Sequence, residues 1–101
     1  KRTFGSDYMD SPSGFVTDKD MLIIIEHRGA RLTMLDIDDK LIRYVGENSG
    51  ISQTENWPNN AREQHHPGKF NSPHSMAIDG TGNLYVAEWL IGGRMTKLEK
   101  Q

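Results

Sequence analysis

Short runs in which apolar and polar residues alternate cover most of the chain, and this alternation has the period of a β-strand. In the first half, "GFVTD", "MLIIIE", "RLTMLDI" and "LIRYVG" predict four strands between residues 13 and 46. In the second half, "SMAID", "NLYVAEW" and "RMTKLEK" predict three more between residues 74 and 99. Asp18 and Asp79 precede the turn signals "KD" and "GTG" and are predicted to accept hydrogen bonds from turn amides. Weak helical character is confined to "NNAREQHH", so the chain is predicted to be all-β.

The two groups of strands are similar enough to be copies of one unit. "SPSGFVTDKDMLIIIEHRGARLTML" aligns with "SPHSMAIDGTGNLYVAEWLIGGRMTKL" after two short length differences. The aligned pairs are Pro12 and Pro73, Asp18 and Asp79, Leu22 and Leu84, Glu26 and Glu88, Arg31 and Arg94, Thr33 and Thr96, and Leu35 and Leu98. A repeated four-stranded antiparallel unit is typical of the blades of a β-propeller, which bury one another's faces. A β-sandwich with accidental internal similarity is the alternative.

These boundaries divide the single unit of residues 1–101 into three parts. Residues 11–47 are predicted to form a first, four-stranded blade, and residues 71–101 a second, incomplete blade without its fourth strand. Residues 48–70 form a polar loop insert, rich in asparagine, glycine and proline, which is expected to be the most irregular part of the molecule. Trp57 in this insert is expected to pin the loop to the blade, with coverage of a ligand as the alternative.

Composition removes several classes of function. The 12 basic and 14 acidic residues give a net charge of −2 without a continuous basic face, so nucleic acid is not expected as a partner. The longest apolar run, "MLIII", is far below the ~20 residues that span a bilayer, so a soluble chain without a membrane partner is expected. The absence of cysteine excludes disulfides and leaves the compartment open, secretion and the periplasm included. The chain starts at Lys1 rather than at methionine, which suggests a piece of a longer protein.

Charged side chains that recur in both copies are expected to serve the fold. Glu26 with Arg31, and Glu88 with Arg94, stand at matching places. Because a guanidinium and a carboxylate are planar groups that suit paired hydrogen bonds, each couple predicts a contact inside or between blades.

His74 is the strongest candidate for chemistry. The corresponding residue in the first copy is Ser13, so the geometry of the blade does not require an imidazole there. At the start of an innermost strand, His74 would point to the propeller axis, where nitrogen ligands of zinc could converge, although one histidine cannot hold zinc alone. A structural, channel-lining role is the alternative. His27 is expected in a surface turn, with binding as the alternative, and the adjacent His65 and His66 are expected to be solvated loop residues.

The pattern F-x-x-P-H-S-x-A-x-D-x-x-G-x-L-Y-V-A-E-x-x-x-G-x-R-x-x-K-L resembles the NHL-type repeat of six-bladed β-propellers. The run "YVGENSG...HPGKFNSPHSMAID" is similar in particular to peptidyl-α-hydroxyglycine α-amidating lyase and its bacterial relatives. The likeness extends over about residues 11 to 99, and the order of elements looks like the C-terminal two blades of those bacterial proteins. It implies that the chain is a β-propeller fragment of about two four-stranded antiparallel blades.

The resemblance also implies a site. In the lyase family, histidines of "PH" motifs from different blades hold a zinc ion in the central channel, with a calcium ion nearby, and His74 is the residue here that matches such a motif. Ser75 stands where one version of the motif has the aspartate that helps to bind calcium, which argues for zinc over calcium. Arg28 in "HRG" resembles an arginine of the lyase's first blade. The family's tyrosine and arginine after the second strand have no clear counterparts, because "EHRGAR" and "EWLIGGR" stand in those places, so catalysis is left open.

Two functions therefore stand as alternatives. The chain is either part of a zinc-dependent lyase that acts when the ring of blades is complete, or a non-catalytic propeller module that binds a small peptide-like or small-molecule ligand. Both outer blade faces need a neighbour, so self-association is expected, with three two-blade chains completing six blades. The strand "RMTKLEK" is expected to have an unpaired edge, and the segment "KRTFGSDYM" is a candidate to supply its missing neighbour.

Overall fold

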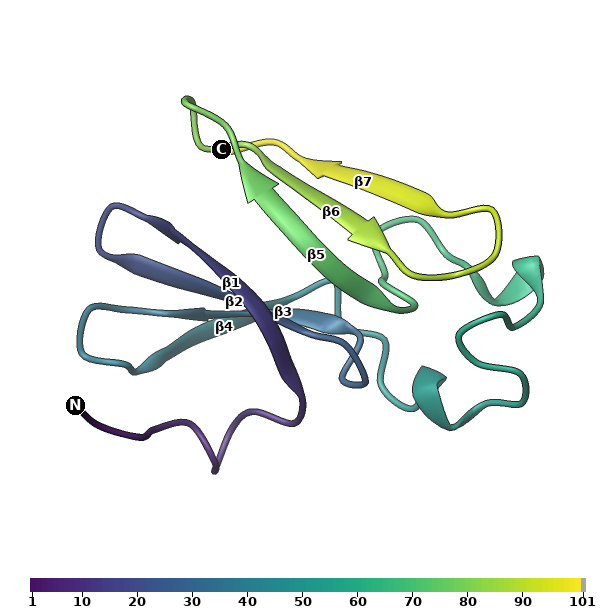
Figure 1. The fold of residues 1–101 in the computed structure, drawn as a ribbon, viewed down its shortest axis with the longest axis horizontal. Helices are drawn as coiled ribbons and strands as arrows, with labels where there is room; N and C mark the ends of the chain where they lie inside the picture. Colours follow the sequence, from purple (N-terminus) through teal and green to yellow (C-terminus); the bar gives the residue numbers. More distant parts are fainter. Residues whose placement is uncertain (101) are drawn as a thin grey trace.

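The computed structural model describes residues 1–100 and contains two antiparallel β-sheets joined by a long loop (Figure 1). The strand order is β1-β2-β3-β4 in the first sheet and β5-β6-β7 in the second. The strands are β1 Pro12–Asp18, β2 Met21–Glu26, β3 Arg31–Leu35, β4 Leu41–Val45, β5 Pro73–Ile78, β6 Leu84–Glu88 and β7 Arg94–Leu98. The all-β prediction is confirmed, with one sheet of four strands and one of three. No helix among the described residues is long and apolar enough to cross a membrane.

The first hairpin of each sheet is closed by a different turn. Asp79 Oδ1 accepts hydrogen bonds from the backbone N–H groups of Thr81 and Asn83, at 2.9 and 3.0 Å, so the predicted role of this aspartate is confirmed. Asp18 occupies the same place before the β1–β2 turn, which has two residues, and its carboxylate instead accepts a hydrogen bond from Lys100 Nζ at 3.0 Å. The prediction for Asp18 is wrong because the shorter turn does not offer the same amides.

The two sheets pack on each other through faces that do not correspond. The first sheet contributes one row of apolar side chains to the shared core: Val16, Ile23, Ile25, Leu32 and Met34. The second sheet contributes another: Met76, Ile78, Leu84, Val86 and Leu98. In the repeat, Leu84 and Val86 correspond to Leu22 and Ile24, which lie on the opposite face of the first sheet. One face of the first unit therefore contacts the reverse face of the second, in a head-to-tail order.

Contact between the sheets is concentrated at their first strands. β5 lies against β1 and β2, as Figure 1 shows, whereas the later strands of the two sheets diverge. Each sheet thus presents its first strand at the centre of the molecule.

The loop between the sheets is irregular apart from two short 3₁₀ helices, η1 Ile51–Gln53 and η2 Arg62–Gln64. It is nevertheless tied to both sheets. Ile51 is buried in the shared core, and the Asn48 backbone N–H donates a hydrogen bond to the carbonyl oxygen of Ala30, in the turn between β2 and β3, at 3.2 Å. Trp57 Nε1 donates to the carbonyl oxygen of Asn71 at 2.8 Å, so the expected pinning of the loop by this indole is observed.

The N-terminal segment covers part of the outer face of the first sheet and does not add a strand to the second. Tyr8 donates a hydrogen bond through its hydroxyl to the carbonyl oxygen of Asp39 at 2.7 Å. The carbonyl oxygen of Tyr8 accepts hydrogen bonds from the Tyr44 hydroxyl at 2.5 Å and from Arg31 Nη2 at 3.2 Å. Within this chain, the proposed pairing of the segment with β7 is therefore wrong, because these contacts hold it against β3 and β4.

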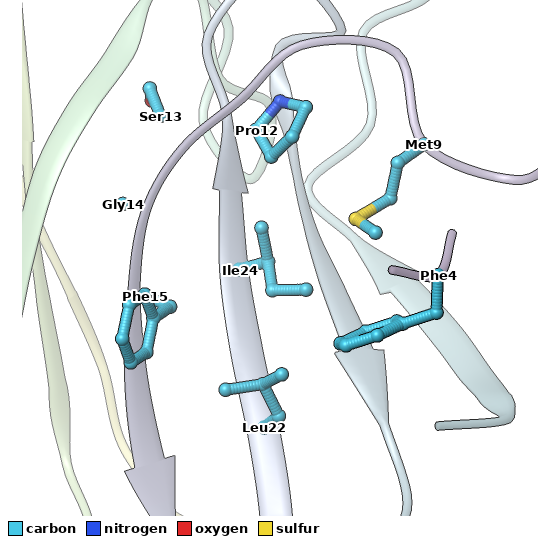
Figure 2. A pocket seen from close by; sticks show the side chains of 8 residues that line it. All are labelled: Phe4, Met9, Pro12, Ser13, Gly14, Phe15, Leu22 and Ile24. Atoms are coloured by element: carbon cyan, nitrogen blue, oxygen red, sulfur yellow. The ribbon is translucent and has the colours of Figure 1, made fainter. Parts of the chain in front are cut away.

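An apolar cavity of about 500 Å³ remains between this segment and the first sheet. Figure 2 shows Phe4 and Met9 of the segment on one side of it and Leu22 and Ile24 of β2 behind it. Phe15 of β1 closes the far side and is 69% exposed. The outer face of the first sheet is thus only partly covered, although the corresponding face of the second sheet packs into the shared core.

Candidate ligand-binding site

A buried glutamate fastens the start of the first unit. Glu26 accepts hydrogen bonds from the backbone N–H groups of Asp10 and Ser11, from the hydroxyl of Thr33, and from Arg31 Nε at 2.9 Å. Burial alone would raise the pKa of Glu26, but the hydrogen bonds from Arg31, Thr33 and Asp10, with the attraction of the guanidinium, lower it below the usual value. The predicted contact between glutamate and arginine is confirmed, and the backbone bonds extend it.

The second unit repeats this arrangement. Glu88 accepts hydrogen bonds from the backbone N–H groups of Asn71 and Ser72, the latter at 3.0 Å, and from the guanidinium of Arg94. We call each set of a glutamate, an arginine and two backbone N–H groups a glutamate clamp. Because each clamp holds the two residues before the proline of its own unit, it fixes where the first strand of that unit begins.

Directly after the proline, both first strands carry a β-bulge. The pairing register skips His74 between Pro73 and Ser75 in β5, and it skips Ser13 at the corresponding place in β1. A bulge turns a side chain out of the regular alternation of the strand. The clamp and the bulge together explain why His74 is exposed at the end of its sheet.

His74 belongs to a group of four rings that we call the histidine–tryptophan cluster: His27, Trp57, His74 and Trp89. The centroid of the His27 ring lies 5.6 Å from that of His74, 4.9 Å from that of Trp57 and 5.9 Å from that of Trp89, and the centroids of His74 and Trp89 are 5.2 Å apart. His27 Nδ1 lies 3.1 Å from the carbonyl oxygen of Pro73. As a donor in this bond, Nδ1 carries the proton and leaves Nε2 of His27 free to accept.

A cavity of about 450 Å³ adjoins the cluster and is bounded by His27, Trp57 and Trp89 together with Arg28. The Arg28 guanidinium is exposed and lies 5.8 Å from the centroid of the Trp57 ring, and it is the charged group of the cavity wall. Trp89 is 63% exposed and offers much of its indole to solvent. Indole and imidazole faces pack well on planar groups, and the guanidinium favours a negative or strongly polar one.

The exposure of the four histidines agrees only in part with the expectation from the sequence. His74 lies in the cluster, and His66 is exposed as expected. His27 is half-buried rather than in a free surface turn, because that turn lies against the start of β5. His65 is also half-buried, with Nε2 enclosed, so its assignment as a solvated loop residue is wrong. A place for Trp89 in a site was not predicted from the sequence. Trp89 directly follows Glu88, just as His27 directly follows Glu26 in the first unit.

The described residues do not complete a zinc site. His27 and His74 bring two imidazoles together, but in residues 1–100 no group of three or more His, Cys, Asp and Glu side chains is arranged to hold a metal ion. Zinc sites in proteins use three or four protein ligands. The described residues therefore bring two imidazoles together, and a zinc site at His74 would need further ligands from elsewhere.

Comparisons with known proteins do not assign the chain to a family. No family model matches the chain, and neither the curated proteins nor the solved structures give a match. The likeness to NHL propellers consequently rests on the sequence motifs.

Proposed function

We propose that the chain is a pair of consecutive blades of an NHL-type β-propeller, and that it functions as an assembly and ligand-binding module. The observation that carries this proposal is the head-to-tail order of the two sheets. In a β-sandwich made of two copies related by a two-fold axis, corresponding faces would meet. Here opposite faces meet, and repeating such a contact adds further units around an axis, as the blades of a propeller do.

The same order supplies an interface for further copies. The outer face of the first sheet carries the exposed Phe15 and the buried Ile24, the counterparts of the half-buried Met76 and the buried Val86. The outer face of the second sheet has apolar or aromatic side chains at four of the five positions that correspond to the core row of the first, namely Ala77, Tyr85, Ala87 and Met95, and Lys97 stands at the fifth. A second chain would therefore repeat the contact already present inside the first. Three chains would complete six blades and bring three copies of His74 around one axis.

Light scattering on the purified chain tests assembly. The wild-type mass at micromolar concentration should exceed that of a monomer. Phe15→Asp should give a monomer, because it places a charge on the open face of the first sheet without disturbing a buried residue. Ile37→Asp is the matched control, since Ile37 is 66% exposed in the β3–β4 turn and should leave the mass unchanged. A monomeric wild-type chain would refute the assembly part of the proposal.

For the ligand, the cavity beside the histidine–tryptophan cluster fits a small peptide-like or planar molecule that carries a negative or polar group. Trp57 and Trp89 are the two tryptophans of the chain and both border the cavity, so ligand binding should change the fluorescence. Titration with a library of small carboxylates and acidic peptides, on the wild type and on Arg28→Ala, tests this part. Loss of binding in Arg28→Ala supports it, and equal binding by both proteins contradicts it.

A lyase related to the amidating family is the second candidate, and one observation favours it. His74, which matches the PH motif of that family, lies beside His27 in the cluster, and Arg28, which resembles an arginine of the lyase's first blade, lies 5.8 Å from the centroid of the Trp57 ring. Zinc content after purification without chelator separates the two functions. Stoichiometric zinc that is lost in His74→Ala and kept in His66→Ala would favour the lyase, whereas a zinc-free assembled chain would favour the binding module.

A further inference from the structure

Residues 1–9, which we call the N-terminal strap, lie over the outer face of the first sheet, on the side away from the second sheet (Figure 1). Two side chains of that face, Ile24 and Leu35, are 6% and 0% exposed, although they are not part of the core cluster that the two sheets share. Ile24 lines the same apolar cavity as Phe4 and Met9 of the strap (Figure 2). The strap therefore takes part in shielding this face from water.

On the second sheet, the corresponding face is covered by a whole sheet instead. Val86 and Leu98 are the counterparts of Ile24 and Leu35 in the repeat, and both pack into the shared core against the first sheet. A second copy of the chain that docked in the same head-to-tail order would bring its second sheet over Ile24 and Leu35. The strap lies there in the single chain, so the strap and a second copy compete for one place.

The end of the strap has a counterpart in the second unit and can stay where it is. The carbonyl oxygen of Tyr8 accepts a hydrogen bond from Arg31 Nη2 at 3.2 Å, and the carbonyl oxygen of Lys69 accepts one from the guanidinium of Arg94. Tyr8 and Lys69 each stand four residues before the proline of their unit. Since Lys69 keeps this bond while the two sheets are packed together, Tyr8 can keep its own. Residues 1–7 are then the part of the strap that has to move.

Residues 1–7 are held by contacts that water can replace. Arg2 forms an ion pair with Asp39 at 2.6 Å, but the Arg2 side chain is 68% exposed, and exposed ion pairs contribute little to stability. Phe4 is 38% exposed and borders a cavity of about 500 Å³, so one side of its ring lacks packing partners. The backbone N–H of Met9 donates to the carbonyl oxygen of Gly5 at 2.9 Å and closes a turn that can act as the hinge.

We infer that residues 1–7 are a displaceable cover that competes with a second copy of the chain for the outer face of the first sheet, and that they set the concentration at which chains assemble. This inference rests on the assembly part of the proposed function. Exchange of the strap for a sheet favours assembly, because a sheet also reaches Phe15, which the strap leaves 69% exposed.

Analytical ultracentrifugation of the full chain across a concentration series tests the competition. Gly5→Ala opens the strap without changing a side chain of the docking face, since φ of Gly5 is +96° and an added Cβ would collide with the terminal methyl group of Met9. The midpoint concentration of assembly should fall about tenfold, which corresponds to the cost of a left-handed alanine in the closed strap. Gly80→Ala is the matched control, because its Cβ would meet open space, and it should assemble like the wild type.

The double variant Arg2→Ala/Phe4→Ala removes the ion pair and the ring that hold the strap, and it should lower the midpoint in the same direction. Lys1→Ala removes a positive charge at the exposed neighbouring position and should leave the midpoint unchanged. A higher midpoint in both strap variants would show that the strap belongs to the interface between copies. That result, or an unchanged midpoint in both, would overturn the inference.

Thiol labelling follows the opening of the strap in the single chain. The chain has no cysteine, so Ile24→Cys places one thiol beneath the strap. In a Phe15→Asp background, addition of Gly5→Ala should speed labelling about tenfold, because the strap is open more often; an unchanged rate would overturn the inference. A wild-type chain that is monomeric at every concentration would overturn the proposed assembly and the competition together. An assembled wild type whose midpoint does not respond to the strap variants would overturn the competition alone.

Discussion

Removal of the glutamate from the second clamp should destabilise the chain strongly. In Glu88→Ala, the backbone N–H groups of Asn71 and Ser72 lose their acceptor, and both residues are fully buried. Each buried donor left unpaired costs about 1–3 kcal/mol. Arg94 also loses its partner, but its side chain is 25% exposed and can turn to water. The expected loss is about 3–5 kcal/mol, the range found when one partner of a buried ion pair is removed.

Glu88→Gln separates the geometry of the clamp from its charge. The amide keeps a carbonyl oxygen for the two backbone donors, while the charge-assisted part of the bonds is lost, so the expected loss is about 1–2 kcal/mol. Urea unfolding at neutral pH, followed by tryptophan fluorescence, measures the free energy of unfolding of both variants. Glu99→Gln is the control, because the Glu99 side chain is 71% exposed and the change should stay within about 0.5 kcal/mol. A loss below about 1 kcal/mol in Glu88→Ala, with an unchanged slope against urea, would refute the clamp as a stabilising device.

Three further predictions follow from the same structure. The pKa of Glu26 in the folded chain lies below its unfolded value, so its contribution to stability is complete above the unfolded pKa and is lost as the pH falls through the folded pKa. In Glu26→Gln, the free energy of unfolding measured with urea should therefore depend less steeply on pH in the acidic range. An unchanged pH dependence would contradict this prediction. Leu32→Ala should cost about 2–5 kcal/mol because Leu32 is fully buried, whereas Ile37→Ala should cost little because Ile37 is 66% exposed; equal costs by thermal unfolding would contradict the assignment of the core. Gly46→Ala should cost at least about 2 kcal/mol, because φ is +68° and the new Cβ would lie 2.5 Å from the Phe70 ring, and a wild-type melting temperature would contradict this.

The strands could be predicted from the sequence because their signals are local. The continuous apolar run of β2, the alternation of apolar and polar residues in β3 and the turn residues around them specify these strands without reference to the rest of the chain. The contacts of Glu26 with Arg31 and of Glu88 with Arg94 could also be predicted, since a recurring pair of opposite charges is visible in the repeat. The turn role of Asp18 could not, because it depends on the length of one turn rather than on the residue type.

The site depends on relations between elements that are far apart in the sequence. His27 and His74 meet because one sheet lies across the start of the other, and no local pattern carries that information. The burial of Asn60 could not be predicted for the same reason. In the sequence Asn60 is one asparagine among several in a polar loop, and its burial arises only when the loop is tied to the β6–β7 connection through Asn59. Packing between elements that are distant in the sequence thus determines which polar residues are buried and which are brought together.

The glutamate clamps have a consequence for how such a chain can change during evolution. Each clamp holds the residues at the start of its own unit through its own glutamate. The segment that connects the two units therefore takes no part in the hydrogen bonds of either clamp to the two residues before the proline. A gene that encodes such units can lengthen, shorten or replace the connecting segment while the first strand of the next unit still starts at its proline. Those parts of the long stretch between the two sheets that lie outside the shared core are therefore where new sequence can be gained at small cost, and Trp57 is found in this stretch.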